Sequence, residues 1–326
     1  MVRSRTRRAL ILKWALSLFL LALVLIYVPL RDVGNVLANA KPLWVACGIA
    51  VLLIMRLTSA YRMYIITHHQ GISLSIIDIF KIGFVTAFFG LFLPGYIAGG
   101  AIRWHMLSRK DKKGVEAIAS IAFDRVNDTI VLLLLGCISL IAASPIPIPP
   151  VVPWILTAAL VAFLILYVVL LSPQATRLLV KISTILGLYQ RPWFNKIFTG
   201  LTDSMARFHQ FSVLVQLKLW GLSLLCHVMG TLVFVLMAGA LELGLSFADC
   251  AWLRTILHLL FLLPISVSGI GVRESALVVL LAPFSISSAQ AVACSFLLMA
   301  GLLVMVGIGG LLTPSMYLRP GKETSK

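Results

Sequence analysis

The chain has 326 residues, of which 60% are hydrophobic, and its mean hydropathy of +1.04 excludes a soluble globular domain of this length. Its net charge of +16 would suit nucleic acid, but the basic residues lie in short loops between apolar runs. Basic residues in this arrangement are typical of the cytoplasmic loops of membrane proteins. The sequence therefore predicts an all-α polytopic membrane protein and argues against a nucleic-acid partner.

Apolar runs of about 20 residues are long enough to cross a bilayer. The first run follows a basic N-terminus that resembles a signal peptide, but it is longer than a signal-peptide core, and charged residues follow it directly. We therefore interpret it as an uncleaved first span with a cytoplasmic N-terminus. The spans predicted in the first half of the chain are residues 14–30, 43–60, 116–142 and 152–172.

Residues 79–102 are apolar, but cationic residues lie on both sides of the stretch. Arg56, Arg62 and Lys81 flank its beginning, and a second cluster runs from Arg103 onwards. Two clusters on opposite sides of the membrane would contradict the positive-inside pattern. A re-entrant hairpin that enters and leaves on the cytoplasmic side resolves this conflict.

Residues 173–217 are the one long region without a span, and their apolar residues recur at helical spacing. This pattern predicts amphipathic helices on the cytoplasmic surface, either as an interfacial linker or as a sensor of lipid headgroups. Residues 218–240 then cross outward, residues 255–283 form a second re-entrant stretch from the outer side, and residues 289–312 lead to a cytoplasmic C-terminus. The whole chain, residues 1–326, is predicted to be one domain of about six transmembrane helices and two re-entrant broken helices.

The two re-entrant stretches share a motif in which leucine, proline, glycine and arginine keep one spacing, at positions 93, 94, 99 and 103 and at positions 263, 264, 269 and 273. Chance is the weaker explanation, because proline and arginine are both matched. Proline removes a backbone donor and glycine leaves the backbone unprotected, so such breaks need protein or a water-filled cavity around them. Because the two copies of the motif are predicted to enter from opposite faces of the membrane, they form an inverted repeat like that of many secondary transporters. The residues predicted to break the helices are Pro94, Gly99, Gly100, Pro264, Gly269 and Gly271.

Arg103 and Arg273 each close one of the broken stretches. Arg273 lies on the predicted outer side, where cations are scarce, and it follows two glycines. Glycine-rich backbone at a helix N-terminus, together with an arginine fork, suits the phosphate of a phospholipid or of a polyprenyl-phosphate-type lipid. The alternatives are an ordinary cytoplasmic anchor for Arg103 and a structural pair between Arg273 and Glu274.

Asp124, Arg125 and Asp128 lie within the predicted span 116–142, Asp124 about 12 Å along the helix. The two aspartates share one helix face, and Arg125 is three residues from Asp128. Ionisable residues at such depth usually face a cavity or a partner. We expect a charged lining for a headgroup or a proton relay; a self-neutralised cluster that locks the hairpin is the alternative.

Signals for an enzyme are weak. The sequence has no nucleophile elbow, phosphate-binding loop, metalloprotease motif or sugar-nucleotide signature, and its histidines form no paired pattern. The five cysteines are scattered and show no metal-ligand spacing. We therefore predict no catalytic residues, no metal site and no cofactor.

The chain resembles the transmembrane, flippase-like region of lysylphosphatidylglycerol synthases. The resemblance covers essentially the whole chain and implies a membrane domain that moves a lipid between leaflets. An acidic residue often found in this family is replaced by Ala101, and the soluble aminoacyl-transferase domain is not expected here, so the protein should not make lysyl-lipid by itself. The motifs that carry the resemblance are Gly99-Gly100-Ala101-Ile102-Arg103, Asp124-Arg125, and Pro264 followed by Gly269-Ile270-Gly271-Val272-Arg273-Glu274.

Together these features predict a translocase of lipids or lipid-linked saccharides in the inner membrane of the cell envelope. The predicted site residues are Arg103, Asp124, Arg125, Asp128, Arg273 and Glu274. The other functions considered are a membrane enzyme and an accessory subunit of envelope lipid or polysaccharide biosynthesis. A lipid synthase or glycosyltransferase is a candidate partner, and a homo-oligomer is left open.

Overall fold

The computed structural model describes residues 26–92, 96–143, 148–185, 192–262 and 269–317, together with Phe19 and Ala22. Every regular element within these ranges is helical, which confirms the all-α fold class. More than half of the predicted first span, residues 14–30, lies outside the described residues. The count of about six spans therefore stays a prediction.

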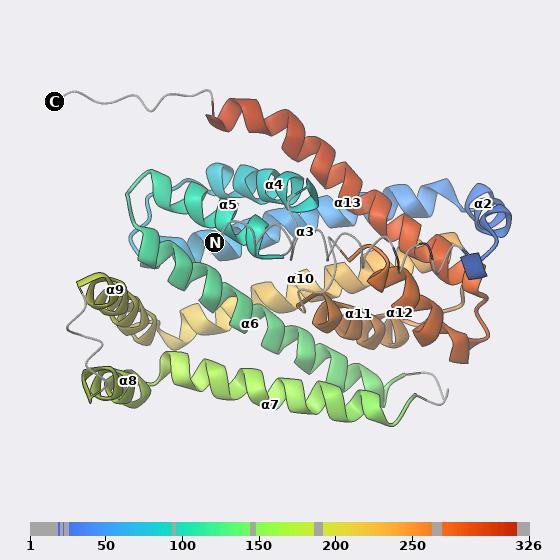
Figure 1. Cartoon of the computed structure of the whole chain (residues 1–326). Coiled ribbons are helices and arrows are strands. Elements are labelled where there is room, and N and C mark those ends of the chain that lie inside the picture. Colours follow the sequence, from blue (N-terminus) through green and yellow to red (C-terminus); the bar gives the residue numbers. More distant parts are fainter. Residues whose placement is uncertain are drawn as a thin grey trace.

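Five long helices lie side by side and form the body of the molecule (Figure 1). Four of them are long and apolar enough to cross a membrane: α3, α7, α10 and α13. The fifth, α6, has 28 residues and is about 42 Å long, but it carries three charged residues in its first half. Their bounds are α3 Pro42–His69, α6 Gly114–Ile141, α7 Val151–Leu171, α10 Val213–Ala240 and α13 Ser288–Tyr317.

The limits of α3 correct one prediction. Residues 43–60 were expected to form the span, with Arg56 and Arg62 in or near a cytoplasmic connection, but α3 continues to His69. Arg62 is buried, because the run of apolar residues continues beyond it and packs against α6 and α10. Both arginines therefore lie inside the helix bundle.

Short helices lie across the two ends of the bundle (Figure 1). At one end are α8 (Pro173–Ile185) and α9 (Pro192–His209), and at the other is α2 (Leu30–Ala38). Leu178, Ile182 and Ile185 form an exposed apolar side of α8, as expected for an interfacial helix. On the α9 side, Phe208 stacks on Phe123 of α6 at 4.4 Å between ring centroids, so this helix is anchored to the bundle.

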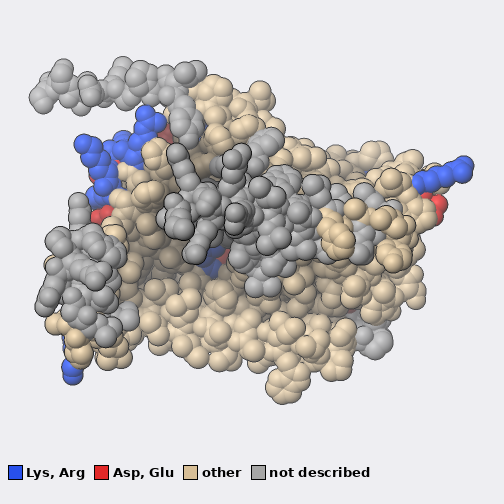
Figure 2. Space-filling model, viewed as in Figure 1, with Lys and Arg blue, Asp and Glu red and all other residues tan. Residues whose placement is uncertain are grey.

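The charged surface is also divided between the ends. In the view of Figure 2, most of the blue side chains gather at the end that carries α8 and α9, and few appear at the opposite end. Between them the described surface is almost entirely uncharged. An uncharged belt between charged ends is the surface expected of a protein that spans a bilayer.

The first predicted re-entrant stretch folds as a hairpin of α4 (Ile76–Phe92) and α5 (Tyr96–Arg109). Asp111, just after α5, accepts hydrogen bonds from the backbone N–H and the hydroxyl of Ser73, just before α4, both at 2.7 Å. Lys113 donates to a backbone carbonyl of the same turn at 2.8 Å. The hairpin therefore begins and ends at one end of the bundle, beside the C-terminal end of α3.

The second stretch folds as a hairpin of α11 (Phe247–Leu262) and α12 (Val272–Leu281). Trp252, in the first turns of α11, stacks on Phe284, just after α12, with ring centroids 6.3 Å apart. Both outer ends of this hairpin therefore also lie together.

The two hairpins enter the bundle from opposite ends (Figure 1). Lys41, just before α3, forms an ion pair of 2.5 Å with Glu242, just before α11. The second hairpin thus starts beside the N-terminal end of α3, whereas the first starts beside its C-terminal end. The position of each hairpin relative to a bilayer stays a prediction.

The glycines of the second break lie in the turn before α12. Gly269 and Gly271 have φ angles of +78° and +80°, a left-handed conformation that only glycine adopts readily. They hold the chain in a non-helical turn directly before Arg273. Pro264 lies outside the described residues.

The glycines of the first break lie elsewhere. Gly99 and Gly100 are inside α5, several residues after the connection from α4, so they do not form the break itself. A Cβ on Gly99 would already touch Thr86 of α4 at 3.6 Å. Small residues of this kind let two membrane helices pack closely, which overrides the poor helix propensity of glycine. Pro94 lies outside the described residues.

Candidate functional site

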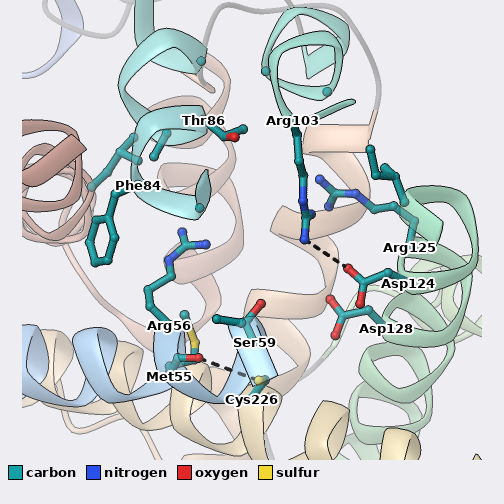
Figure 3. A pocket seen from close by; sticks show the side chains of 18 of the residues that line it. Met55, Arg56, Ser59, Phe84, Thr86, Arg103, Asp124, Arg125, Asp128 and Cys226 are labelled. Carbon is teal, nitrogen blue, oxygen red and sulfur yellow. Dashed lines mark hydrogen bonds and ion pairs between the residues drawn. The ribbon is translucent and has the colours of Figure 1, made fainter. Parts of the chain in front are cut away.

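A cavity of about 710 Å³ lies in the middle of the bundle, between the two hairpins. Its lining comes from α4 and α5 of the first hairpin, from α11 and α12 of the second, and from α3, α6, α10 and α13. Figure 3 labels five of the charged side chains that face it: Arg56, Arg103, Asp124, Arg125 and Asp128. A charged spot is also visible within the uncharged belt in Figure 2. The hairpins that enter from opposite ends therefore meet at one polar site.

Arg62 of α3 is the centre of the buried ion pairs. Its Nε donates to Oδ1 of Asp124 at 2.8 Å, and its Nη1 donates to Oδ1 of Asp128 and to the hydroxyl of Ser223 at 2.9 Å. Only 4% of the Arg62 side chain and 5% of the Asp124 side chain are exposed. Asn127 donates to the same serine at 2.9 Å. Arg62 thus joins α3, α6 and α10, a role that the sequence pattern did not reveal.

Three other arginines extend toward the open part of the cavity from three helices (Figure 3). Arg103 of α5 approaches Asp124, with Nη2 and Oδ2 3.7 Å apart. Arg125 of α6 points toward Arg103. Arg56 of α3 donates through Nε to the thioether sulfur of Met305 at 2.8 Å, a weak acceptor. Arg103 and Arg125 were predicted site residues, whereas Arg56 was missed.

His227 of α10 connects Asp128 to a further arginine. Its Nε2 lies 2.8 Å from the carbonyl oxygen of Asp128, and its Nδ1 lies 3.1 Å from Nη1 of Arg254. A carbonyl only accepts and a guanidinium only donates, so Nε2 carries the proton and Nδ1 accepts. The imidazole is therefore neutral in this arrangement and adds no charge to the site.

Two polar atoms at the cavity have no hydrogen-bond partner among the described residues. They are Nε2 of His258, on α11, and the hydroxyl oxygen of Thr86, on α4. Leaving a buried polar atom unpaired costs about 1–3 kcal/mol, so these atoms mark places where a ligand or water would bind. His258 was not among the site residues predicted from the sequence.

Arg273 and Glu274 form a closed network at the N-terminus of α12. Arg273 donates to Oε1 of Glu274 at 3.0 Å and to the hydroxyl of Ser295 at 2.6 Å, and this hydroxyl donates to Glu274 at 2.5 Å. The other carboxylate oxygen accepts from the backbone N–H of Gly271 at 2.7 Å. Arg273 contributes to the cavity lining, but its main contacts are those of the structural pair considered from the sequence.

The cavity thus brings Arg103, Asp124, Arg125, Asp128 and Arg273 together, with Glu274 directly behind Arg273. It adds Arg56, Arg62 and Arg254. Within the described ranges, no group of three or more His, Cys, Asp or Glu residues could hold a metal ion. What the site offers a ligand is therefore arginine hydrogen-bond donors and positive charge.

These features define a multi-pass membrane protein with a charged site enclosed by its helices. The chain belongs to the family described as the lysylphosphatidylglycerol synthase TM region, whose model matches residues 10–310. This match confirms the resemblance seen in the sequence motifs. A search of curated proteins found no match. The family and the apolar helices indicate a membrane protein of envelope lipid metabolism.

Proposed function

We propose that the protein is a translocase that moves lipids or lipid-linked saccharides with an anionic headgroup between the leaflets of the inner membrane. The observation that carries this proposal is the arginine-lined cavity between two hairpins that enter from opposite ends of the bundle. A headgroup needs a polar path through the bilayer, whereas its acyl or prenyl chains do not.

The arginines are suited to replace the water around such a headgroup. A charged group in the hydrocarbon region costs several kcal/mol unless it is paired or hydrated. Arg56, Arg103 and Arg125 come from three different helices and turn toward one space (Figure 3). Guanidinium groups bind phosphate through two parallel hydrogen bonds, which a lysine does not reproduce.

The arrangement of the hairpins supports transport by alternating access. In transporters with inverted repeats, broken helices from both sides meet at a central site, and rocking of one repeat against the other exposes the site to each face in turn. The cavity here has that position between α4–α5 and α11–α12. We propose that the two hairpins act as the gates toward the two leaflets.

We further propose that the end with α8, α9 and the Asp111 turn is cytoplasmic, because most of the visible cations gather there (Figure 2). The chain termini would then also be cytoplasmic. No motif for nucleotide-driven transport or for catalysis occurs in the sequence, so we propose transport rather than an enzymatic reaction.

The test is reconstitution in liposomes with a headgroup-labelled anionic lipid and an impermeant quencher. The purified protein should move label between leaflets, and Arg103→Gln should slow this about ten-fold or more, since a charge-assisted hydrogen bond contributes about 1.5–3 kcal/mol. Arg109→Gln is the matched control, because Arg109 is on the same helix but exposed. No transfer above protein-free vesicles, or equal rates for both variants, would refute the proposal. Chemical conversion of the lipid would favour an enzyme instead. Transfer that occurs only when a synthase is present would favour an accessory subunit.

A further inference from the structure

The charges of the cavity do not balance. Six arginines line it, from α3, α5, α6, α11 and α12, against the two aspartates of α6. Glu274 adds one more negative charge, because it pairs with Arg273 directly beside the lining. With His227 neutral, the side chains leave an excess of three positive charges. The six arginines are Arg56, Arg62, Arg103, Arg125, Arg254 and Arg273.

No other carboxylate of the described residues lines the cavity to compensate this excess. The sequence holds 11 Asp and Glu residues, and none of them falls in the undescribed segments 93–95 and 263–268 next to the cavity. Of the remaining eight, Glu323 lies outside the described residues; the other seven are not part of the lining, and most have partners elsewhere, such as Glu116 with Arg207 and Glu242 with Lys41. These eight are Asp32, Asp78, Asp111, Glu116, Asp203, Glu242, Asp249 and Glu323.

The excess is concentrated where the cavity is open. Arg62 and Arg273 are bound by carboxylates, and Arg254 contacts a neutral imidazole. Arg56 and Arg103 turn toward the middle of the cavity, where one has a thioether contact and the other a carboxylate oxygen at 3.7 Å. Uncompensated charges inside a protein are costly, so the occupied site should contain the missing negative charge.

We propose that the cavity takes a headgroup with at least two negative charges, a terminal phosphomonoester or a diphosphate, in preference to a phosphodiester. This inference rests on the proposed function and specifies its substrate class. A phosphodiester carries one negative charge and leaves two arginines uncompensated, whereas a dianion leaves one and a trianion none. A lysyl ester on the headgroup would add positive charge and increase the excess.

The shape of the site favours the same headgroups. Guanidinium groups that approach from α3, α5 and α6 require a ligand that accepts hydrogen bonds on several sides (Figure 3). A terminal phosphate offers three acceptor oxygens, while a phosphodiester has two non-bridging oxygens. The unpaired atoms of Thr86 on α4 and His258 on α11 add further hydrogen-bonding positions in the lining.

The experiment compares lipids with identical acyl chains by native mass spectrometry of the purified protein at pH 8, where a phosphomonoester is fully charged. The probes are phosphatidic acid, phosphatidylglycerol and lysylphosphatidylglycerol, with inorganic pyrophosphate as a free anion. We expect phosphatidic acid to bind about ten-fold or more tightly than phosphatidylglycerol, and lysylphosphatidylglycerol to bind most weakly. Arg56→Gln should reduce this preference, whereas Arg109→Gln should retain it.

The outcomes separate this inference from the proposed function. Equal affinity for phosphatidic acid and phosphatidylglycerol, lowered alike by Arg56→Gln, would overturn the charge preference and leave a lipid site. Binding of every lipid independent of Arg56 would overturn both. Pyrophosphate that binds as tightly as phosphatidic acid would support the charge preference but assign the site to a free anion. The wild-type comparison decides the preference even if the variant does not fold.

Discussion

Removal of Arg62 should destabilise the protein more than removal of any exposed arginine. Arg62→Met keeps most of the side-chain volume but leaves Asp124 and Asp128 without their main partner. Breaking a buried ion pair costs about 3–5 kcal/mol, because the remaining charge stays buried and uncompensated. Arg103 still lies near Asp124, and the neutral His227 still lies 3.1 Å from Oδ1 of Asp128. We therefore expect a loss at the lower end of this range, about 3 kcal/mol.

The free energy of unfolding is measured in detergent micelles by tryptophan fluorescence, with Arg109→Met as the exposed control. A triple variant, Arg62→Met with Asp124→Asn and Asp128→Asn, removes the unpaired charges and should recover most of the lost stability. If Arg62→Met is as stable as Arg109→Met, the cluster is not held together by this arginine. If the triple variant is no better than the single one, the loss comes from packing rather than from unpaired charge.

Three further predictions test the packing, a surface turn and the topology. Gly309→Ala should cost about 1–3 kcal/mol of stability, because its Cβ would clash with the backbone oxygen of Phe84 in α4, whereas Gly307→Ala on the same helix meets open space; equal stabilities would contradict this contact. Hydrogen bonds from Ser73, above all from its backbone N–H, lower the pKa of Asp111 below its ordinary value of 3.8. The stability that these bonds add is therefore fully present above pH 3.8 and is lost as the pH falls through the lowered pKa of the folded protein. Melting temperatures of the wild type and Asp111→Asn should therefore converge at acidic pH, and a constant difference would refute this linkage. Single cysteines at Lys112 and Glu242 in a cysteine-free background should react with an impermeant reagent from opposite sides of the membrane, and labelling from one side would overturn the opposed hairpins.

The sequence analysis missed Arg56, Arg62 and Arg254 for one physical reason. Arg56 and Arg62 were placed beside a cytoplasmic connection, since an arginine near the end of an apolar run is usually an anchor at the membrane surface, and Arg254 was not among the predicted site residues. In the folded chain these arginines are inside the bundle, where Arg62 is bound by the aspartates of α6, Arg254 contacts His227 of α10, and Arg56 contacts Met305 of α13. Which cations are buried depends on partners from other helices, and no spacing along the chain reveals those partners.

The shared motif shows a similar limit. The sequence placed Arg103 and Arg273 in equivalent positions, and both do reach the cavity. However, Gly269 takes a left-handed φ in a turn, while Gly99 is helical and packs against α4. One residue pattern thus gives two local conformations, because the neighbouring helix decides whether a glycine serves a turn or a close contact.

The sequence by itself determined the membrane class, the all-helical fold, the family and the charged segment of α6, because hydropathy and rare intramembrane charges are properties of short stretches. Opposite entry of the two hairpins was also predicted from the sequence, but only the tertiary structure decided that they meet at one cavity. It also decided that Glu274 neutralises Arg273, while Arg56 and Arg103 face the open part of the site. Charge balance in a cavity is a sum over side chains from many helices, so it appears only when those helices are packed together.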